Sequence, residues 1–143
     1  MSDDLALARK IMLERGASLV VVRDGDILFI GRSGGLKDLA KIALGEPSLL
    51  EGSSIADKVV GKAAALIFSM NRAKAVYAGL ISSYGLEELQ KSRIRVSYER
   101  LVPYIEAPGG GICPFEKLVL GFGDPREAYR RLLEKFEEVF GRL

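Results

Sequence analysis

The chain has 143 residues and a mass of 15.6 kDa, with 48 % hydrophobic and 28 % charged residues, the size and balance of one globular domain. It contains no His, no Trp, no Thr and a single Cys. These absences exclude a Ser-His-Asp triad, a His-ligated zinc, an imidazole base and an internal disulfide. The net charge of +2, with acidic and basic residues interleaved, predicts no nucleic-acid-binding face.

Composition also bears on where the protein works. No apolar run reaches the roughly 18 residues of a membrane span, and the segment Met1–Asp4 is acidic where a signal peptide would be basic. We therefore expect a cytoplasmic protein with neither a membrane nor a nucleic-acid partner. Asn71 and Gln90 are the only side-chain amides, which favours a thermophilic source because heat-labile amides are depleted there.

The first half of the chain predicts a helix, a β-hairpin and two further helices. The hairpin is the strongest signal, because Asp24-Gly25 separates two β-branched runs. The longest helical pattern begins at Ser53 or Ser54 and runs to about Met70. In chain order the expected elements are a helix at 3–15, strands at 18–23 and 27–30, and helices at 36–44 and 53–70.

The second half predicts a strand–helix–strand unit followed by helices. The short spacing within this unit predicts parallel pairing with a right-handed crossover. Pro103 is tolerated only at the edge of a sheet, so an additional edge strand is expected around it. The expected elements are a strand at 73–81, a helix at 84–91, strands at 94–98 and 101–105, and helices at 114–120 and 125–140.

This order of elements predicts one domain over residues 1–143, a three-layer α/β sandwich with a mixed sheet. The segments 55–65 and 113–117 resemble those of a small uncharacterised prokaryotic family placed in the cytidine deaminase-like superfamily. The resemblance covers the chain from about Ser18. It implies a cytidine deaminase-like fold, and it implies no particular activity because the function of that family is not established.

The superfamily's zinc chemistry requires His or Cys, any residue, then Glu at one helix start, and Pro-Cys-x-x-Cys at another. The matching stretches here are Asp57-Lys58-Val59 and Ser82–Leu86. Val59 cannot move protons, and neither Ser83 nor Leu86 is a plausible zinc ligand. We therefore expect no metal and no cofactor.

Residues around the first of these stretches have two interpretations each. Ser54 and Asp57 have the spacing of a capping box, which explains Asp57 structurally, while a helix start facing a cleft gives it a functional role. Lys58 and Lys62, one helical turn apart, form either a solvated face or a pair of cations for an anionic ligand. Gly61 indicates close packing or the approach of a ligand to the backbone.

Cys113 is the most distinctive candidate. Cys113–Glu116 parallels Asp124–Glu127, each reading as a cap, Pro at the first helical position and an acid at the third. Cys is not a favoured cap, and a helix N-terminus stabilises a thiolate. Cys113 is therefore either an inert, half-buried thiol or a nucleophile that Lys58, Lys62 or Lys117 would have to activate.

Three functions follow from these candidates. The first is a zinc-free domain that binds a small anionic or nucleotide-like ligand at helix N-termini that meet at one edge of the sheet. The expected ligand contacts are Ser54, Lys62, Ser83 and Glu116.

The second function is an enzyme of different chemistry with Cys113 as nucleophile near Asp57 and Lys58. It requires Asp57 and Cys113 to lie within roughly one ligand's width of each other, lining one pocket. The third is a structural or regulatory module that binds another protein. The apolar stripe of the last helix indicates either core or the face of a homodimer.

Overall fold

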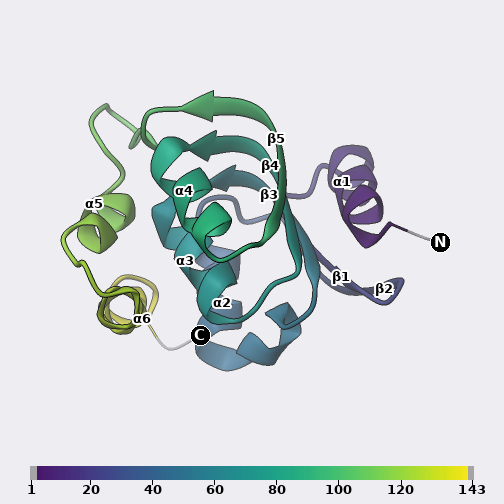
Figure 1. The fold of residues 1–143 in the computed structure, drawn as a ribbon, viewed down its shortest axis with the longest axis horizontal. Helices are drawn as coiled ribbons and strands as arrows, with labels where there is room; N and C mark the ends of the chain where they lie inside the picture. The colour runs from purple at the N-terminus through teal and green to yellow at the C-terminus, as the bar shows by residue number, and fades with distance from the viewer. Residues whose placement is uncertain (1–2, 142–143) are drawn as a thin grey trace.

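Five strands form one mixed sheet in the order β2-β1-β3-β4-β5 in the computed structural model, which describes residues 3–141. Six α-helices accompany the sheet in this part of the chain (Figure 1). In chain order the elements are α1 (Asp4–Arg15), β1 (Leu19–Arg23), β2 (Asp26–Gly31), α2 (Lys37–Gly45), a 3-10 turn η1 (Pro47–Leu50), β3 (Ser54–Val60), α3 (Lys62–Met70), β4 (Ala75–Ser82), α4 (Ser83–Lys91), β5 (Arg95–Val102), α5 (Pro114–Leu120) and α6 (Pro125–Phe140).

The pairing of the strands confirms the hairpin and the parallel unit. β1 pairs antiparallel with β2 and with β3, whereas β3–β4 and β4–β5 are parallel. Asp24 and Gly25 both have positive φ, 52° and 81°, as a two-residue hairpin turn of the primed type requires. The separate edge strand predicted at 101–105 is wrong, because Leu101 and Val102 are the end of β5 and the chain leaves the sheet at Pro103.

The long helix predicted over 53–70 is also wrong. Ser54–Val60 is the strand β3, and α3 begins at Lys62 with Gly61 as its N-cap. β3 is the middle strand of the sheet and is buried on both faces over most of its length, so its apolar residues do not alternate with polar ones. Because that alternation is missing, the run of small and apolar residues in β3 was interpreted as part of a helix.

This correction changes the geometry of the candidates. Ser54 caps no helix, and the predicted capping box with Asp57 does not exist. Lys58 lies in β3 while Lys62 is the first residue of α3, so the two are not one helical turn apart. Gly61 ends the strand and caps the helix, rather than interrupting a helix.

The two faces of the sheet carry unequal helical cover. α1 lies alone on one face, and the other helices lie on the opposite face (Figure 1). Alternation along the strands separates two cores. On the α1 side, Val20, Ala56 and Tyr77 pack with the helix, whereas on the other side Val21 and Ile55 face the larger core.

The two C-terminal helices begin and end as predicted. Each has Pro at its first position, and Asp124 caps α6 by accepting the Arg126 N–H at 2.9 Å. Much of the apolar stripe of α6 lies in the core, because Leu132 and Phe136 are fully buried and Phe136 packs against Phe115 of α5, whereas Val139 is 51 % exposed. Within residues 3–141, no helix is both long and apolar enough to cross a membrane.

Candidate functional site

A buried carboxylate lies at the carboxyl ends of β3 and β4. Glu116 of α5 is 1 % exposed, and its Oε2 accepts hydrogen bonds from the Lys62 N–H at 2.7 Å and the Ser82 hydroxyl at 2.6 Å. Its Oε1 accepts the Ile105 N–H at 2.6 Å. One side chain thus joins α5 to the starts of α3 and α4 and to the loop that follows β5. From the sequence, Glu116 was predicted only as a contact of a ligand.

Two glycines permit this close assembly. A Cβ at Gly61 would lie 2.7 Å from Ile105 Cγ1 and 2.9 Å from Glu116 Oε2. A Cβ at Gly85, in the first turn of α4, would lie 3.0 Å from backbone atoms of Val60 and Gly61. The close-packing interpretation of Gly61 is therefore confirmed, although its place is the β3–α3 junction.

A cavity of about 330 Å³ lies beside the carboxylate, at the carboxyl ends of the parallel strands. The start of α3 forms one wall, and the chain from Ile105 through Glu116 forms the other. The lining is mostly apolar, and its side-chain polar groups are Glu106, Cys113 and Glu116. It includes no Lys or Arg. The lining residues are Gly35, Leu36, Val59, Gly61, Ala63, Ala64, Ile105, Glu106, Ala107, Pro108, Cys113, Pro114, Phe115 and Glu116.

Of the predicted site residues, Cys113 and Glu116 line this cavity. Cys113 is half-buried, and its side chain makes no cap hydrogen bond to α5. The remaining candidates lie outside the lining. Lys62 contributes its backbone N–H to Glu116, and the Ser83 hydroxyl donates to the Val102 carbonyl at 3.4 Å.

Three candidates belong to β3. Ser54 is buried at the start of the strand, and Lys58 is exposed near its end. Asp57 lies within the strand, next to Leu19 of β1 and Ala78 of β4. Neither Asp57 nor Lys58 is among the residues that line the cavity with Cys113, and the expectation that Asp57 starts a helix is wrong.

The carboxyl group of Asp57 is buried, with 5 % of the residue exposed. Burial, with a smaller contribution from the charge of Asp38, raises the pKa of Asp57 to about 8, although hydrogen bonds from the N–H groups of Val59 and Lys58 act to lower it. The Val59 N–H lies 3.3 Å from Asp57 Oδ1. Asp57 is therefore a largely protonated, uncharged group at neutral pH.

The two stretches that the sequence matched to zinc patterns take different places in the fold. The first, Asp57-Lys58-Val59, lies within β3 and not at the start of a helix. At the second pattern, the Ser82 hydroxyl accepts the Gly85 N–H at 3.0 Å and donates to Glu116. The Glu116 carboxylate therefore joins the starts of α3 and α4 through hydrogen bonds.

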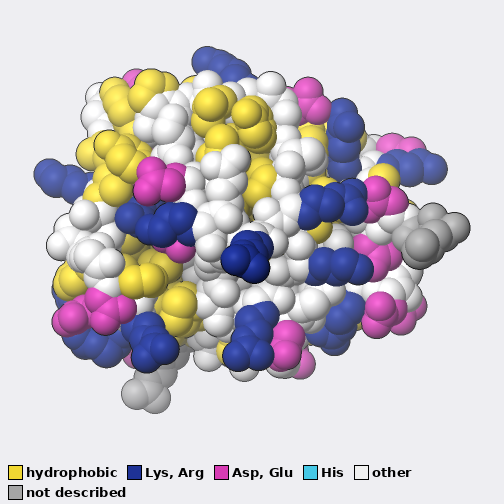
Figure 2. Space-filling model, in the orientation of Figure 1, with side chains coloured by type: hydrophobic (Ala, Val, Ile, Leu, Met, Phe, Trp, Pro, Cys, Tyr) yellow, Lys and Arg dark blue, Asp and Glu magenta, His cyan; other side chains and the backbone are white. Residues whose placement is uncertain are grey.

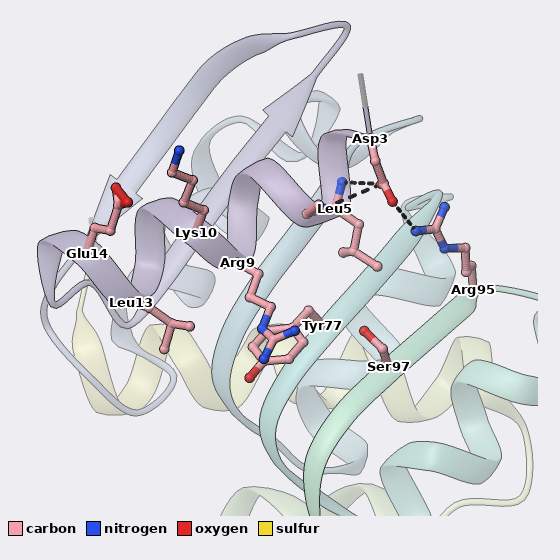
Figure 3. A pocket seen from close by; sticks show the side chains of 10 residues that line it. Asp3, Leu5, Arg9, Lys10, Leu13, Glu14, Tyr77, Arg95 and Ser97 are labelled. Carbon is pink, nitrogen blue, oxygen red and sulfur yellow. Dashed lines mark hydrogen bonds and ion pairs between the residues drawn. The ribbon is translucent and has the colours of Figure 1, made fainter. Parts of the chain in front are cut away.

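A second hollow, of about 530 Å³, lies on the opposite face between α1 and the strands β4 and β5 (Figure 3). The Arg9 guanidinium lies 4.9 Å from the centre of the Tyr77 ring and 2.8 Å from Glu99 Oε1. Arg95 pairs with Asp3 at 2.8 Å. Sequence reasoning missed this hollow, because its residues come from three elements and form no motif.

The fold and the strand-end geometry define an α/β domain with a mixed sheet, a buried carboxylate at the carboxyl ends of β3 and β4, and an apolar cavity beside that carboxylate. The chain belongs to the TM1506 family, a domain of unknown function (DUF1893), whose family model matches residues 7–136.

A solved structure of the same family is similar over nearly the whole chain. It is a crystal structure of a DUF1893 family protein (TM1506) from Thermotoga maritima, 33 % identical to this chain with a TM-score of 0.84. The match covers 94 % of this chain and 92 % of that one. No curated protein matches this chain.

Proposed function

We propose that this domain binds a small, largely uncharged molecule in the apolar cavity beside Glu116. The observation that carries the proposal is the cavity itself: about 330 Å³ at the carboxyl ends of β3 and β4, lined by apolar side chains. Ligands of α/β sheets bind at such strand ends, and their pockets are mostly apolar with a few polar groups. The Cys113 thiol and the Glu106 carboxylate supply those polar groups here.

The lining favours a neutral ligand over the expected anion. A phosphate or nucleotide would meet carboxylates and no cation in this cavity, and unpaired buried charge is costly. The cations predicted for an anion, Lys58 and Lys62, have side chains outside the lining. A neutral heterocycle of nucleobase size meets the same walls without that cost.

The enzyme alternative has less support. A Cys113 nucleophile needs a base or a cation beside it, and Asp57 and Lys58 lie in β3, outside the cavity. We therefore favour binding over covalent chemistry at Cys113.

We propose a three-layer, cytidine deaminase-like arrangement, supported by the mixed sheet with α1 on one face and the other helices opposite. We also propose a cytoplasmic protein from a thermophile. The scarcity of side-chain amides supports the thermophilic source.

A fragment screen tests the binding site. Neutral aromatic heterocycles should shift the NMR signals of residues 105–116 and of the start of α3, and should slow alkylation of Cys113 by iodoacetamide. Ala107→Phe fills the cavity and should abolish both effects, whereas Ala6→Phe, on the exposed side of α1, should leave them intact. Fragments that bind elsewhere, or that bind Ala107→Phe equally well, would overturn the proposal.

A further inference from the structure

β5 is a long edge strand whose outer side pairs with no strand of the described chain. The Arg95 N–H donates inward to the Lys74 carbonyl that precedes β4. Alternate residues of a strand direct their backbone groups to the same side, so those of Val96, Tyr98 and Arg100 point outward. Eight residues of unpaired edge are a template for another strand.

The other edge of the sheet is protected differently. β2 has six residues, and its pairing with β1 shifts register between Val21 and Val22. Such irregularities twist an edge away from further pairing. The register of β5 with β4 runs from Arg95 to Val102 without a shift.

Exposed apolar side chains surround β5. Figure 2 shows hydrophobic side chains gathered at the top of the view, where Figure 1 places this strand. Tyr98 and Leu101 of β5 are 41 % and 45 % exposed, and they point to opposite faces of the sheet. Tyr84 at the start of α4 and Tyr104 just after β5 are exposed as well. Apolar surface at an unpaired edge is typical of an interface.

The charges along β5 are self-complementary. Arg95 and Glu99 lie on the same face of the sheet, with Ser97 midway between them. In an antiparallel pair related by a two-fold axis at Ser97, each Arg95 lies opposite the partner's Glu99, and each Val96 lies opposite the partner's Tyr98. An axis at Glu99 would instead oppose two like carboxylates. The sequence of the edge thus favours a second copy of itself in one register.

The side chains that would make these ion pairs are accessible. Arg95 and Glu99 are 61 % and 54 % exposed. Arg9 and Tyr77 both donate to Glu99 Oε1, and within residues 3–141 no hydrogen bond reaches Oε2. Arg95 uses one terminal nitrogen for Asp3 (Figure 3).

We infer that two copies of this chain associate through antiparallel β5 edges with Ser97 on the two-fold axis, forming a continuous ten-stranded sheet. The first test is the mass in solution, which should be twice the 15.6 kDa of the chain by light scattering at micromolar concentration. A monomer up to about 1 mM, the weak limit of useful association, would overturn the inference.

A crosslinking experiment tests the register. In a Cys113→Ser background, Ser97→Cys places two thiols opposite each other at a non-hydrogen-bonded pair, where the Cα atoms are about 4.5 Å apart and a disulfide can form. Mild oxidation should therefore give a covalent dimer. Tyr98→Cys and the distant exposed control Ser33→Cys should crosslink far less. Equal or preferential crosslinking at either of these positions would overturn the stated register.

Charge reversal tests the ion pairs. Arg95→Glu or Glu99→Arg alone should weaken dimerisation by about tenfold or more, because each creates two like-charge contacts across the axis. The double variant Arg95→Glu/Glu99→Arg should recover most of the affinity. Thermal melts of all three variants verify that they fold, and failure of the double variant to recover affinity would contradict the pairing.

Discussion

Glu116 shows how one buried side chain can organise several elements. Its carboxylate satisfies two backbone N–H groups and one hydroxyl that would otherwise be buried without partners. Glu127 occupies the equivalent third position of α6 but is exposed. The two positions look alike in sequence, and only the packing of α5 against the strand ends makes Glu116 different.

We expect Glu116→Gln to lower the free energy of unfolding by about 1–3 kcal/mol. The reason is that the amide NH2 group of Gln would face N–H or O–H donors in a buried site, where the carboxylate oxygen accepts hydrogen bonds. Glu127→Gln is the matched control and should change it by less than about 0.5 kcal/mol. Urea unfolding of both variants measures the difference. Equal effects of the two substitutions would contradict the structural role of Glu116.

Asp57 gives the protein a pH-dependent stability. Its folded-state pKa of about 8 lies above its ordinary value of 3.8, so the folded state holds a proton that the unfolded chain releases. The favourable free energy from this proton is complete below the unfolded pKa and is lost as the pH rises toward 8, by roughly 1 kcal/mol per pH unit between the two values.

Asp57→Asn should remove this slope and should make the protein more stable than the parent at pH 8. Asp26→Asn, on the exposed β2, should leave the slope unchanged. Urea unfolding at pH 5, 6.5 and 8 measures both variants. A parent protein whose stability does not fall over this range would show that Asp57 ionises without cost.

At the scale of elements, the sequence predicted most boundaries where local chemistry sets them. α5 and α6 were predicted with their observed bounds because each begins with Pro and is followed by Gly. The Asp24-Gly25 turn predicted the hairpin for the same kind of local reason. The prediction failed for β3 because its strand conformation depends on pairing with β1 and β4, and the local periodicity of the sequence does not show that pairing.

The candidate site was less predictable than the fold. Cys113 and Glu116 were identified from a helix-start motif and do line one cavity. Asp57 and Lys58 were misplaced along with β3. The hydrogen bonds from Lys62, Ser82 and Ile105 to Glu116 join segments distant in sequence, and no spacing rule reveals such contacts.

The first turn of α4 lies so close to the end of β3 that no side chain larger than that of Gly fits at position 85 without a shift. Gly85→Ala would normally favour a helix by about 1 kcal/mol, but here the added Cβ meets three backbone atoms at 3.0 Å. We expect a net destabilisation of about 1–3 kcal/mol from overpacking. Gly45→Ala, in α2 with no atom near the added Cβ, should be neutral or stabilising. Thermal melting of the two variants measures the contrast.

At the scale of the whole molecule, the sheet divides the protein into two unequal halves. On one face, the larger core joins α2, α3, α5 and α6 to the sheet, and Glu116 adds hydrogen bonds among the strand ends. On the other face, α1 alone supplies the helical cover (Figure 1). Its further links to the sheet are exposed: ion pairs such as Arg9–Glu99, which contribute little to stability, and hydrogen bonds from the Asp24 and Gly25 N–H groups to the Asp4 carboxylate.

This asymmetry predicts that α1 unfolds as a separate, less stable unit before the sheet opens. In hydrogen exchange at low denaturant, amides of α1 should exchange before those of α3, β3 and β4. Asp3→Ala removes both the N-cap of α1 and the partner of Arg95, so it should speed exchange in α1 and leave α3 unchanged. Asp26→Asn is again the exposed control and should alter neither helix. If α1 and α3 exchange together in the parent protein, the two layers unfold as one cooperative unit and the division into halves has no energetic meaning.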